Sequence, residues 1–385
     1  MLFRSQHATF WGLGLKMDIG TPGVNSAAFG INQSGQAAVQ TEISTKDPNN
    51  ENFCGYGTGL QCRASVWQGG VTTALPTLGG YNGTVGQINK LGEMAGIAEN
   101  STRDPECPPG VAFTGTGPQV LDFEAVIWGP APGQIRELHP LPGDTVGMAL
   151  WMNDNGQAVG ASGRCGNTML PPVAFGPHAV LWEKDGSVTD LGNLGAAVGN
   201  IGLAINNHGQ VVGTSSLTAQ SPPTTGIHAF LWTTQTGMRD LGALPGDVAS
   251  VGASINDSGE VVGPSFDKDG NPRAFLWQNG VMTDLNTLIP DSSPLYLLFA
   301  DAINSSGEIA GFGAVKSTCM GDPKLCETHA FLAIPNNGAA DRQSAEPAAQ
   351  DMTSKSGQFA LSEDVRKVLR ERLPLGRFGT RPIGH

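Results

Sequence analysis

The chain has 385 residues, of which 54 are glycine, 26 are proline and only 15% are charged. A typical soluble domain carries about 25% charged residues, so this chain has few long polar side chains for helix surfaces and many residues suited to tight turns. The composition therefore favours an all-β fold. With 39% hydrophobic residues the chain can bury a core, and its length is compatible with a single β-barrel or β-propeller.

The charge balance excludes some partners. The 22 Lys and Arg residues stand against 34 Asp and Glu residues, giving a net charge of -12, which is opposite to the basic surface that nucleic acid requires. No apolar run reaches the roughly 18 residues needed to span a bilayer. Residues 1–7 lack the basic, apolar and small-residue order of a secretory signal, so either the protein is cytosolic or this start is internal to a longer precursor.

Three short phrases recur along the chain in a fixed order. The first, Ile-Asn-x-x-Gly or a looser variant of it, has its Asn at 32, 89, 153, 206, 256 and 304, in steps of 57, 64, 53, 50 and 48 residues by subtraction. The second, typified by His-Ala-Phe-Leu-Trp, occupies residues 7–11, 63–67, 123–128, 178–182, 228–232, 273–277 and 329–333. The third, typified by Thr-Asp-Leu-Gly, occupies residues 188–192, 238–242 and 281–286. Each unit then holds four short strands, a period typical of a propeller blade.

Turn chemistry joins these strands into hairpins. In Asn-x-x-Gly the Asn side chain caps a type I turn and the Gly adopts a positive φ, which connects the first two strands of a unit. Asn279-Gly280 is a strong hairpin signal between the third and fourth strands of its unit. The Ala of the second phrase occurs in all seven copies, which we attribute to close packing between sheets, and the Trp is expected to fill the core between blades.

Radial repetition of four-stranded antiparallel units predicts a β-propeller, which protects its sheet edges. A solenoid is less favoured, because its repeats usually run about 20 to 29 residues. Five units are complete and the sixth ends after its third strand, at Ala333. We predict that residues 15–19 supply the missing outer strand and close a six-bladed ring. Because residues 7–11 duplicate residues 329–333, a longer, seven-bladed parent is the alternative.

The repeats end near residue 335, which predicts a propeller domain over residues 1–335 and a tail over residues 336–385. Residues 336–357 are rich in Ala, Ser, Gln and Asp and have little to bury, as in a linker. Residues 362–372 begin with Ser and acidic residues and end with basic ones, as a short helix prefers. We interpret this basic helix as a solvated element rather than a docking element.

The cysteines carry information about the compartment. All six lie in the insert between the second and third strands of a unit, and none forms a Cys-x-x-Cys pair. An even number in long loops suits disulfides in an oxidising compartment, whereas six free cytosolic thiols are the alternative. We predict two local pairs and one pair that bridges adjacent blades: Cys54 with Cys62, Cys319 with Cys326, and Cys107 with Cys165.

Other candidate sites have structural explanations. His7, His178, His228 and His329 share one repeat position, but Arg63, Glu124 and Arg273 occupy it in the other copies, so we expect strand-end hydrogen bonds rather than a metal cluster. Residues 267–271 alternate oxygen donors as calcium prefers, yet Pro272 stands where a glycine is required, and a turn is favoured. Asn82 and Asn100 begin glycosylation-type triplets that we interpret as turns. The familiar hydrolase and nucleotide motifs are absent, and the sequence predicts no catalytic residue, metal or cofactor.

The recurring His-Ala-Phe-Leu-Trp, Thr-Asp-Leu-Gly and Ile-Asn-x-x-Gly-x-Val-Val-Gly strings resemble the HAF-repeat family of predicted extracellular bacterial repeat proteins. The resemblance covers about residues 7 to 333. It implies secretion and a propeller-like repeat without a defined biochemical activity. The chain departs from the family in lacking an evident signal peptide and in having Ala333 where the last Trp would stand, and the resemblance assigns no catalytic residue.

Loop length points to the functional face. The inserts at residues 41–61 and 98–121 are much longer than the one at residues 265–272, and in a propeller such loops emerge together on one face. We predict a monomeric, secreted or surface-exposed recognition propeller that is not catalytic and binds a polymer, such as a polysaccharide, or a protein through these loops, with Glu51, Asp104 and Glu106 as candidate binding residues.

Two alternatives remain open. A secreted carbohydrate-active hydrolase or lyase on the same scaffold would use the same loop carboxylates, and glycoside hydrolysis needs a pair roughly 5 to 9.5 Å apart. A purely structural component of the cell envelope would present a face without any pocket.

Overall fold

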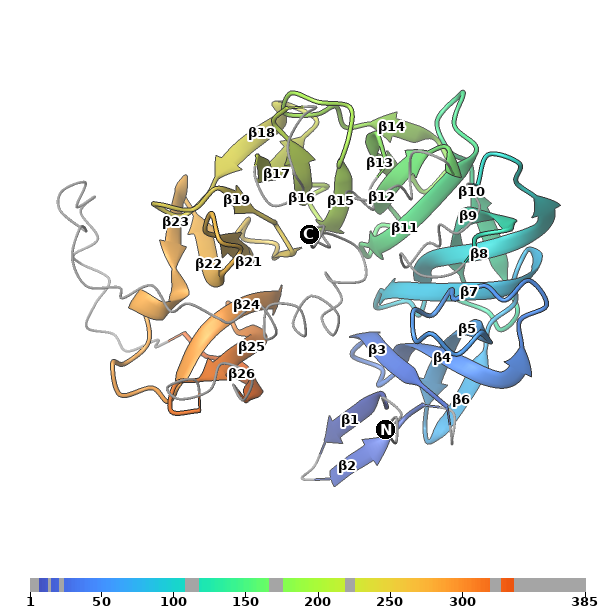
Figure 1. Cartoon of the computed structure of the whole chain (residues 1–385), viewed down its shortest axis with the longest axis horizontal. Coiled ribbons are helices and arrows are strands. Elements are labelled where there is room, and N and C mark those ends of the chain that lie inside the picture. The colour runs from blue at the N-terminus through green and yellow to red at the C-terminus, as the bar shows by residue number, and fades with distance from the viewer. Residues whose placement is uncertain are drawn as a thin grey trace.

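The structure is a computed structural model that describes residues 7–12, 15–20, 24–107, 118–165, 176–218, 226–318 and 327–335. Small antiparallel sheets are arranged around a common centre as a six-bladed β-propeller (Figure 1). The predicted all-β propeller is confirmed. The predicted linker and helix of the tail, and the Cys319–Cys326 pair, lie outside the described residues.

The first three blades each contain four strands, and each sheet is ordered as its strands follow one another in the chain. Blade 1 comprises β3 (Ser26–Ile31), β4 (Ala37–Lys46), β5 (Leu60–Gln68) and β6 (Val71–Ala74). Blade 2 comprises β7 (Gly79–Ile88), β8 (Met94–Arg103), β9 (Leu121–Trp128) and β10 (Ile135–Leu138). Blade 3 comprises β11 (Val146–Met152), β12 (Ala158–Gly163), β13 (His178–Trp182) and β14 (Val188–Asp190).

The remaining blades follow the same plan with two departures. Blade 4 comprises β15 (Ile201–Ile205), β16 (Val211–Ser216), β17 (Ile227–Thr233) and β18 (Gly237–Gly242). In blade 5 the first strand is divided, giving β19 (Ala249–Ser250), β20 (Ser254–Ile255), β21 (Val261–Phe266), β22 (Pro272–Gln278) and β23 (Val281–Asp284), followed by the 3-10 helix η1 (Leu285–Thr287). Blade 6 has β24 (Leu295–Ile303), β25 (Ile309–Val315) and β26 (Thr328–Ala333). No helix among the described residues is long and apolar enough to cross a membrane.

The predicted closure of blade 6 by residues 15–19 is wrong. Strand β2 (Leu15–Asp18) pairs with β1 (Thr9–Gly12) in a separate hairpin, and the described part of blade 6 has three strands. Strands that follow each other closely in sequence usually pair, and here the third-strand phrase at residues 7–11 has its own fourth strand directly after it. The hairpin packs against blade 1, where the rings of Phe10 and Trp67 stack with their centroids 5.2 Å apart.

The turns between the first and second strands have the predicted chemistry. In blade 4 the side-chain Oδ1 of Asn206 accepts hydrogen bonds from the backbone N–H groups of His208 and Gln210, at 3.1 and 3.0 Å, and Gly209 has a φ of 73°. In blade 5 both Asn279 and Gly280 have positive φ values, 53° and 83°, as a type I′ hairpin turn requires.

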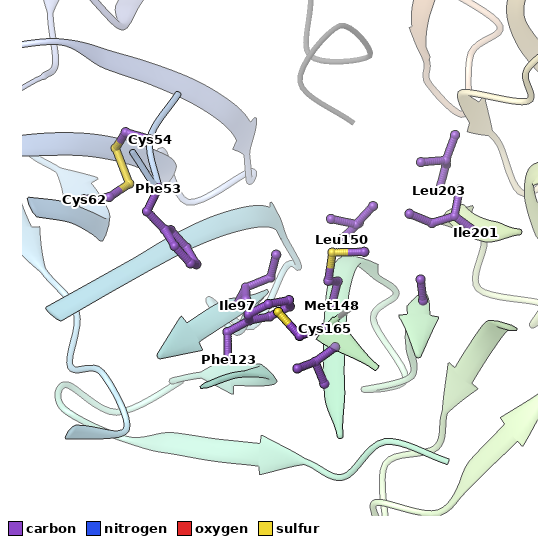
Figure 2. Packing of buried hydrophobic residues seen from close by; sticks show 12 residues of the cluster. Phe53, Cys54, Cys62, Ile97, Phe123, Met148, Leu150, Cys165, Ile201 and Leu203 are labelled. Atoms are coloured by element: carbon purple, nitrogen blue, oxygen red, sulfur yellow. A yellow bond between two sulfur atoms is a disulfide. The ribbon is translucent and has the colours of Figure 1, made fainter. Parts of the chain in front are cut away.

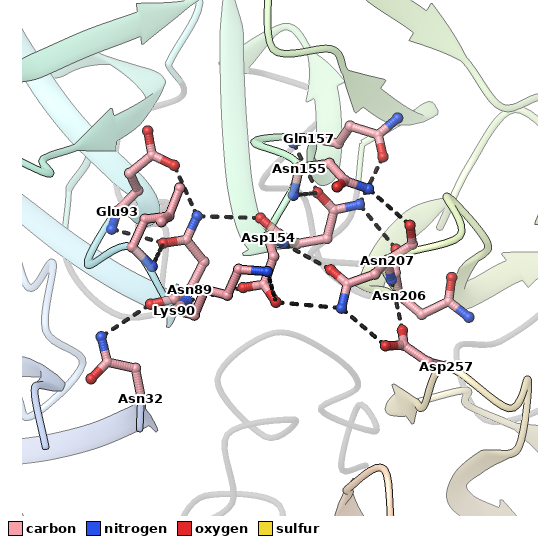
Figure 3. A network of polar contacts seen from close by, with 12 residues as sticks. Asn32, Asn89, Lys90, Glu93, Asp154, Asn155, Gln157, Asn206, Asn207 and Asp257 are labelled. Atoms are coloured by element: carbon pink, nitrogen blue, oxygen red, sulfur yellow. Dashed lines mark hydrogen bonds and ion pairs between the residues drawn. The ribbon is translucent and has the colours of Figure 1, made fainter. Parts of the chain in front are cut away.

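The same asparagines also connect the blades, which the sequence did not predict. The Nδ2 of each donates to the main-chain carbonyl of the corresponding Asn in the next blade, at 2.9 to 3.3 Å: Asn32 to Asn89, Asn89 to Asn153, Asn153 to Asn206, Asn206 to Asn256, and Asn256 to Asn304. Figure 3 shows part of this series, which we call the asparagine ladder. It joins all six blades at the end of the strands where the Asn-x-x-Gly turns lie.

The core lies between neighbouring blades. The second-phrase Ala is buried in six of its seven copies, at residues 8, 64, 125, 179, 229 and 274, and is exposed only at Ala330 in β26. Trp128 and Trp182 have no exposed surface, and their indole Nε1 atoms donate to the carbonyls of Pro76 and His139, at 2.8 and 2.7 Å. Because those carbonyls lie in the links between blades, each tryptophan both fills the core and holds the preceding link.

Candidate functional site

The long loops of blades 1 and 2 are partly strand. Lys46 on β4 still pairs with Leu60 on β5, and Arg103 on β8 pairs with Leu121 on β9. The strands therefore extend into the predicted inserts, and the loops proper span residues 47–59 and 104–120, of which 108–117 lie outside the described part. We call the described residues 47–59, 104–107 and 118–120 the loop face.

Two disulfides hold the loop face. Cys54 pairs with Cys62 within blade 1, and Cys107 of blade 2 pairs with Cys165 of blade 3. Two of the three predicted pairs are therefore confirmed. The Cys54–Cys62 bond lies beside Phe53 in a buried cluster that also contains Ile97 and Phe123 (Figure 2). The loop of blade 1 is thus packed into the core of the adjacent blade.

Glu51 lies at the centre of a buried polar network rather than on the surface. Its exposed fraction is 0%, and its Oε1 accepts hydrogen bonds from the backbone N–H groups of Val120 and Leu121 at 2.6 and 3.0 Å. The Nε2 of Gln119 donates to Oε1 of Glu51 at 3.3 Å and to Oε1 of Glu99 at 3.1 Å. Glu51 therefore attaches the loop of blade 1 to that of blade 2.

A second amide completes the network. The Nδ2 of Asn82, on β7, donates to Asp47 at 2.9 Å and to Glu99 at 3.0 Å. Asn82 and Asn100 lie within β7 and β8, so the interpretation of their triplets as turns is wrong. Burial raises the pKa of Glu51, although the hydrogen bonds from the N–H groups of Leu121 and Val120 act in the opposite direction. The pKa of Glu99 is raised well above its ordinary value by burial and by the nearby Glu51 carboxylate.

Asp104 belongs to a second group of carboxylates. Its Oδ1 accepts the backbone N–H of Glu106 at 2.7 Å. Its Oδ2, the Oδ1 of Asp122 and the Oε2 of Glu124 are buried and have no hydrogen-bond partner among the described residues. Burial first, and then the negative charges of Asp122, Glu137 and Asp104, raise the pKa of Glu124 to about 9. Glu106 itself is accessible and forms an ion pair with Arg164, at 3.0 Å between Oε2 and Nε.

Three of the four repeated histidines, His7, His178 and His228, have the predicted structural role, whereas the exposed His329 lies 3.7 Å from Glu327 and has no fourth strand beside it among the described residues. The Nδ1 of His178 lies 2.9 Å from Asp190 and that of His228 lies 2.9 Å from Asp240, in each case joining the third strand to the fourth. Burial raises the pKa of Asp240, but the hydrogen bonds from His228 and from the N–H of Gly242 outweigh it and leave the pKa lowered. Arg273 makes the corresponding ion pair with Asp284 at 3.2 Å.

Blade 2 departs from this pattern. Glu124 stands at the histidine position, since it is opposite Ala98 as His228 is opposite Ser215. Glu137 stands at the aspartate position, since it is opposite Val126 as Asp240 is opposite Phe230. Two acidic residues therefore replace the usual base and acid, which leaves Glu124 without its partner.

The described residues offer little to a metal ion. One group of potential ligands lies within 4.8 Å, formed by Asp104, Cys107 and Cys165. The two sulfurs are bonded to each other, so they are not available as thiolate ligands. Residues 267–271 form the predicted turn, in which Oδ1 of Asp267 accepts the N–H groups of Asp269 and Asn271, both at 2.9 Å.

Comparison with known proteins gives similarity of fold alone. No protein-family model and no curated protein matches the chain. Among solved structures, the acylaminoacyl peptidase of Pyrococcus horikoshii is 11% identical with a TM-score of 0.47 over 85% of this chain and 46% of that chain. TolB of Acinetobacter baumannii is 13% identical with a TM-score of 0.40 over 69% and 55%, and a streptogramin B lyase is 12% identical with a TM-score of 0.41 over 83% of each chain. The chain thus spans about half the length of the first two proteins, and these similarities assign it no activity.

Proposed function

We propose that the protein is a non-catalytic recognition propeller that binds a polymer or a protein through the loop face. The observation that carries this proposal is the construction of the loops: disulfides, a buried phenylalanine and a carboxylate–amide network fix them in place. A fixed surface loses little conformational freedom when a ligand binds, which favours affinity.

The position of the carboxylates supports binding over hydrolysis. Glu51 and Glu99 share the amide of Gln119, but both have an exposed fraction of 0%. Their oxygens are occupied by Gln119, Asn82 and backbone N–H groups. A sugar could reach these oxygens only after the loops of blades 1 and 2 had separated.

The chemistry of the loop face indicates the ligand class. The exposed carboxylate of Glu106 gives it an acidic group, in keeping with the net charge of -12, so neutral polysaccharides and basic proteins are the favoured ligands. We also propose that the protein is monomeric and works outside the cytosol, because disulfides persist in oxidising compartments and because the HAF-repeat resemblance implies secretion.

A binding screen with loop variants tests this function. The oxidised protein is applied to arrays of polysaccharides and proteins, alongside a variant in which an Asn-Gly link replaces residues 47–59 and Cys62→Ala and Glu99→Gln remove the groups left without partners. A matched control shortens residues 267–271 of blade 5 in the same way. Loop length alone changes stability weakly, but the first variant also loses the buried Phe53 and should melt at a lower temperature than the control. Capture is therefore compared at a temperature where the melts show both variants to be folded, and only the first should lose it.

Two results would overturn the proposal. One is undiminished capture after replacement of residues 47–59, measured where the variant is folded. The other is degradation of a captured polysaccharide by the unaltered protein, seen as new reducing ends or unsaturated ends, which would favour the hydrolase or lyase alternative.

A further inference from the structure

A polar groove lies at the strand ends that carry the Asn-x-x-Gly turns, the opposite end from the loop face. It has a volume of about 400 Å³. Its walls are the β15–β16 turn at residues 208–210, the β17–β18 turn at residues 233–235, and Asp257 from blade 5. The groove is therefore separate from the site proposed above.

The equivalent space in blade 3 is filled. There Glu183 and Lys184 follow the third-strand Trp, where blade 4 has Thr233 and Thr234. The side chain of Lys184 covers Gly156, which is buried. A Cβ added to that glycine would lie 3.2 Å from the Cγ of Lys184 and 3.3 Å from its Cδ. The corresponding Gly209 in blade 4 is partly exposed, and nothing from residues 233–235 comes within 4 Å of such a position. The two short threonines open the groove.

The same replacement leaves an amide without an acceptor. In blade 3 the Nε2 of Gln157 donates to both oxygens of Glu183, at 3.2 and 2.9 Å. In blade 4 the Oε1 of Gln210 accepts from Asn206 at 2.7 Å, but its Nε2 has no acceptor among the described residues. The hydroxyl of Thr233 is bonded to that of Thr236 instead, at 2.8 Å. Two N–H bonds of Gln210 are thus available in the groove.

The other groups in the groove suit a neutral hydroxylated molecule. Asp257 accepts the N–H and the Nδ2 of Asn207 at 2.8 and 3.0 Å, and a carboxylate has further lone pairs for a hydroxyl donor. Thr234, Gln235 and His208 add exposed hydroxyl, amide and imidazole groups. No Lys or Arg lines the groove, so an anion would find no positive partner.

We propose that this groove is a second binding site, which takes a neutral polyhydroxyl ligand such as a saccharide. One hydroxyl of the ligand accepts from Nε2 of Gln210 and a neighbouring hydroxyl donates to the carboxylate of Asp257. The lining has no Phe, Tyr or Trp side chain to stack on a sugar ring, so affinity for a single sugar should be weak, on the order of millimolar.

Side-chain amide NMR tests the proposal directly. The protein is labelled with ¹⁵N-glutamine and titrated separately with glucose, galactose and N-acetylglucosamine into the millimolar range. The side-chain NH₂ signals of Gln210 should shift with at least one sugar, while those of Gln157, held by Glu183, should remain in place.

Two double variants exchange the residues of blades 3 and 4. Thr233→Glu with Thr234→Lys should fill the groove and abolish the Gln210 shift. Glu183→Thr with Lys184→Thr should open a groove in blade 3 and produce a new sugar-dependent shift at Gln157. Each variant installs residues that the neighbouring blade already carries, and a melt records that the fold is kept.

The proposal fails if no sugar shifts Gln210 in the unaltered protein, in which case the groove holds water only. It also fails if the shift survives in the folded double variant that combines Thr233→Glu with Thr234→Lys. Neither result bears on ligand capture by the loop face, so the two sites are tested separately.

Discussion

Replacing Asn153 by alanine measures what the asparagine ladder contributes to stability. Asn153 is buried, with its Nδ2 bonded to Oε1 of Gln157 at 2.7 Å and to the carbonyl of Asn206 at 2.9 Å. Its Oδ1 accepts two backbone N–H groups, those of Asn155 and Gln157, at 3.0 and 3.1 Å. Alanine removes all of these bonds and leaves the carbonyl of Asn206 without this donor.

The chain supplies a matched control at the end of the ladder. Asn304 caps its own turn in the same way, accepting from Ser306 and Glu308 at 2.9 Å and donating to Glu308 at 2.6 Å. It is exposed and has no bond to a further blade within the described residues. The difference in stability between Asn153→Ala and Asn304→Ala therefore measures the buried hydrogen bond between blades, because both variants lose the hydrogen bonds of the turn cap.

The expected difference is large enough to measure. A typical hydrogen bond contributes about 0.5–1.5 kcal/mol net, and a buried group left without its partner costs about 1–3 kcal/mol. We expect Asn153→Ala to lower the free energy of unfolding by about 3 kcal/mol, and Asn304→Ala, whose bonds water can replace, by about 1 kcal/mol.

The free energy of unfolding is measured by guanidinium denaturation, monitored by tryptophan fluorescence. The dependence of that free energy on denaturant concentration is compared between the variants. Equal losses for the two variants would refute the reasoning, because the ladder would then add nothing beyond the local turn caps. A loss for Asn153→Ala of less than about 1 kcal/mol would have the same meaning.

Four further outcomes are expected. Burial raises the pKa of Glu124 to about 9, so the folded protein keeps a proton that the unfolded chain releases, and stability falls as pH rises between about 4.5 and 9. Glu124→Gln should reduce this dependence of stability on pH, measured by urea unfolding at several pH values. An unchanged dependence would contradict the role given to Glu124. Glu124→His should provide Glu137 with the partner that His228 gives Asp240, and raise the melting temperature at pH 6, whereas a lower one would count against that equivalence. Peptide mapping of the oxidised protein should find Cys54 linked to Cys62 and Cys107 to Cys165, and free thiols at these positions would be contrary evidence. Trp182→Ala should cost about 3–5 kcal/mol through the cavity it leaves, and a small loss in the same assay would conflict with its complete burial.

Much of the fold could be predicted because its signals are local. Asn-x-x-Gly sets a turn by hydrogen bonds that reach four residues, and Asn279-Gly280 sets a hairpin by two φ angles. The place of the hairpin β1–β2 could not be predicted from the repeats, because its strands match the phrases of a third and fourth strand equally well in blade 6 or beside blade 1. Packing of Phe10 on Trp67 selects the second position.

At the candidate site, too, local features could be predicted and contacts between blades could not. The cysteine pairing followed from loop position and number, and the histidine role followed from the exchange of His for Arg along the repeat. The burial of Glu51 did not follow, because its partners Gln119 and Val120 come from a different blade, 68 and 69 residues away. The asparagine ladder was missed for a related reason: the repeated Asn is explained by its turn alone, and only the ring geometry shows that its Nδ2 also reaches the next blade.

The disulfide between Cys107 and Cys165 crosses a blade boundary, and this gives the protein two kinds of joint. The loops of blades 1 and 2 are held together by hydrogen bonds around Glu51, whereas those of blades 2 and 3 are held by a covalent bond. A reducing agent would release the second joint and leave the asparagine ladder on the other end of the strands intact. Reduction should then loosen capture at the loop face while the groove beside Gln210 keeps its shape, so the redox state of the surroundings would control one of the two surfaces and leave the other unchanged.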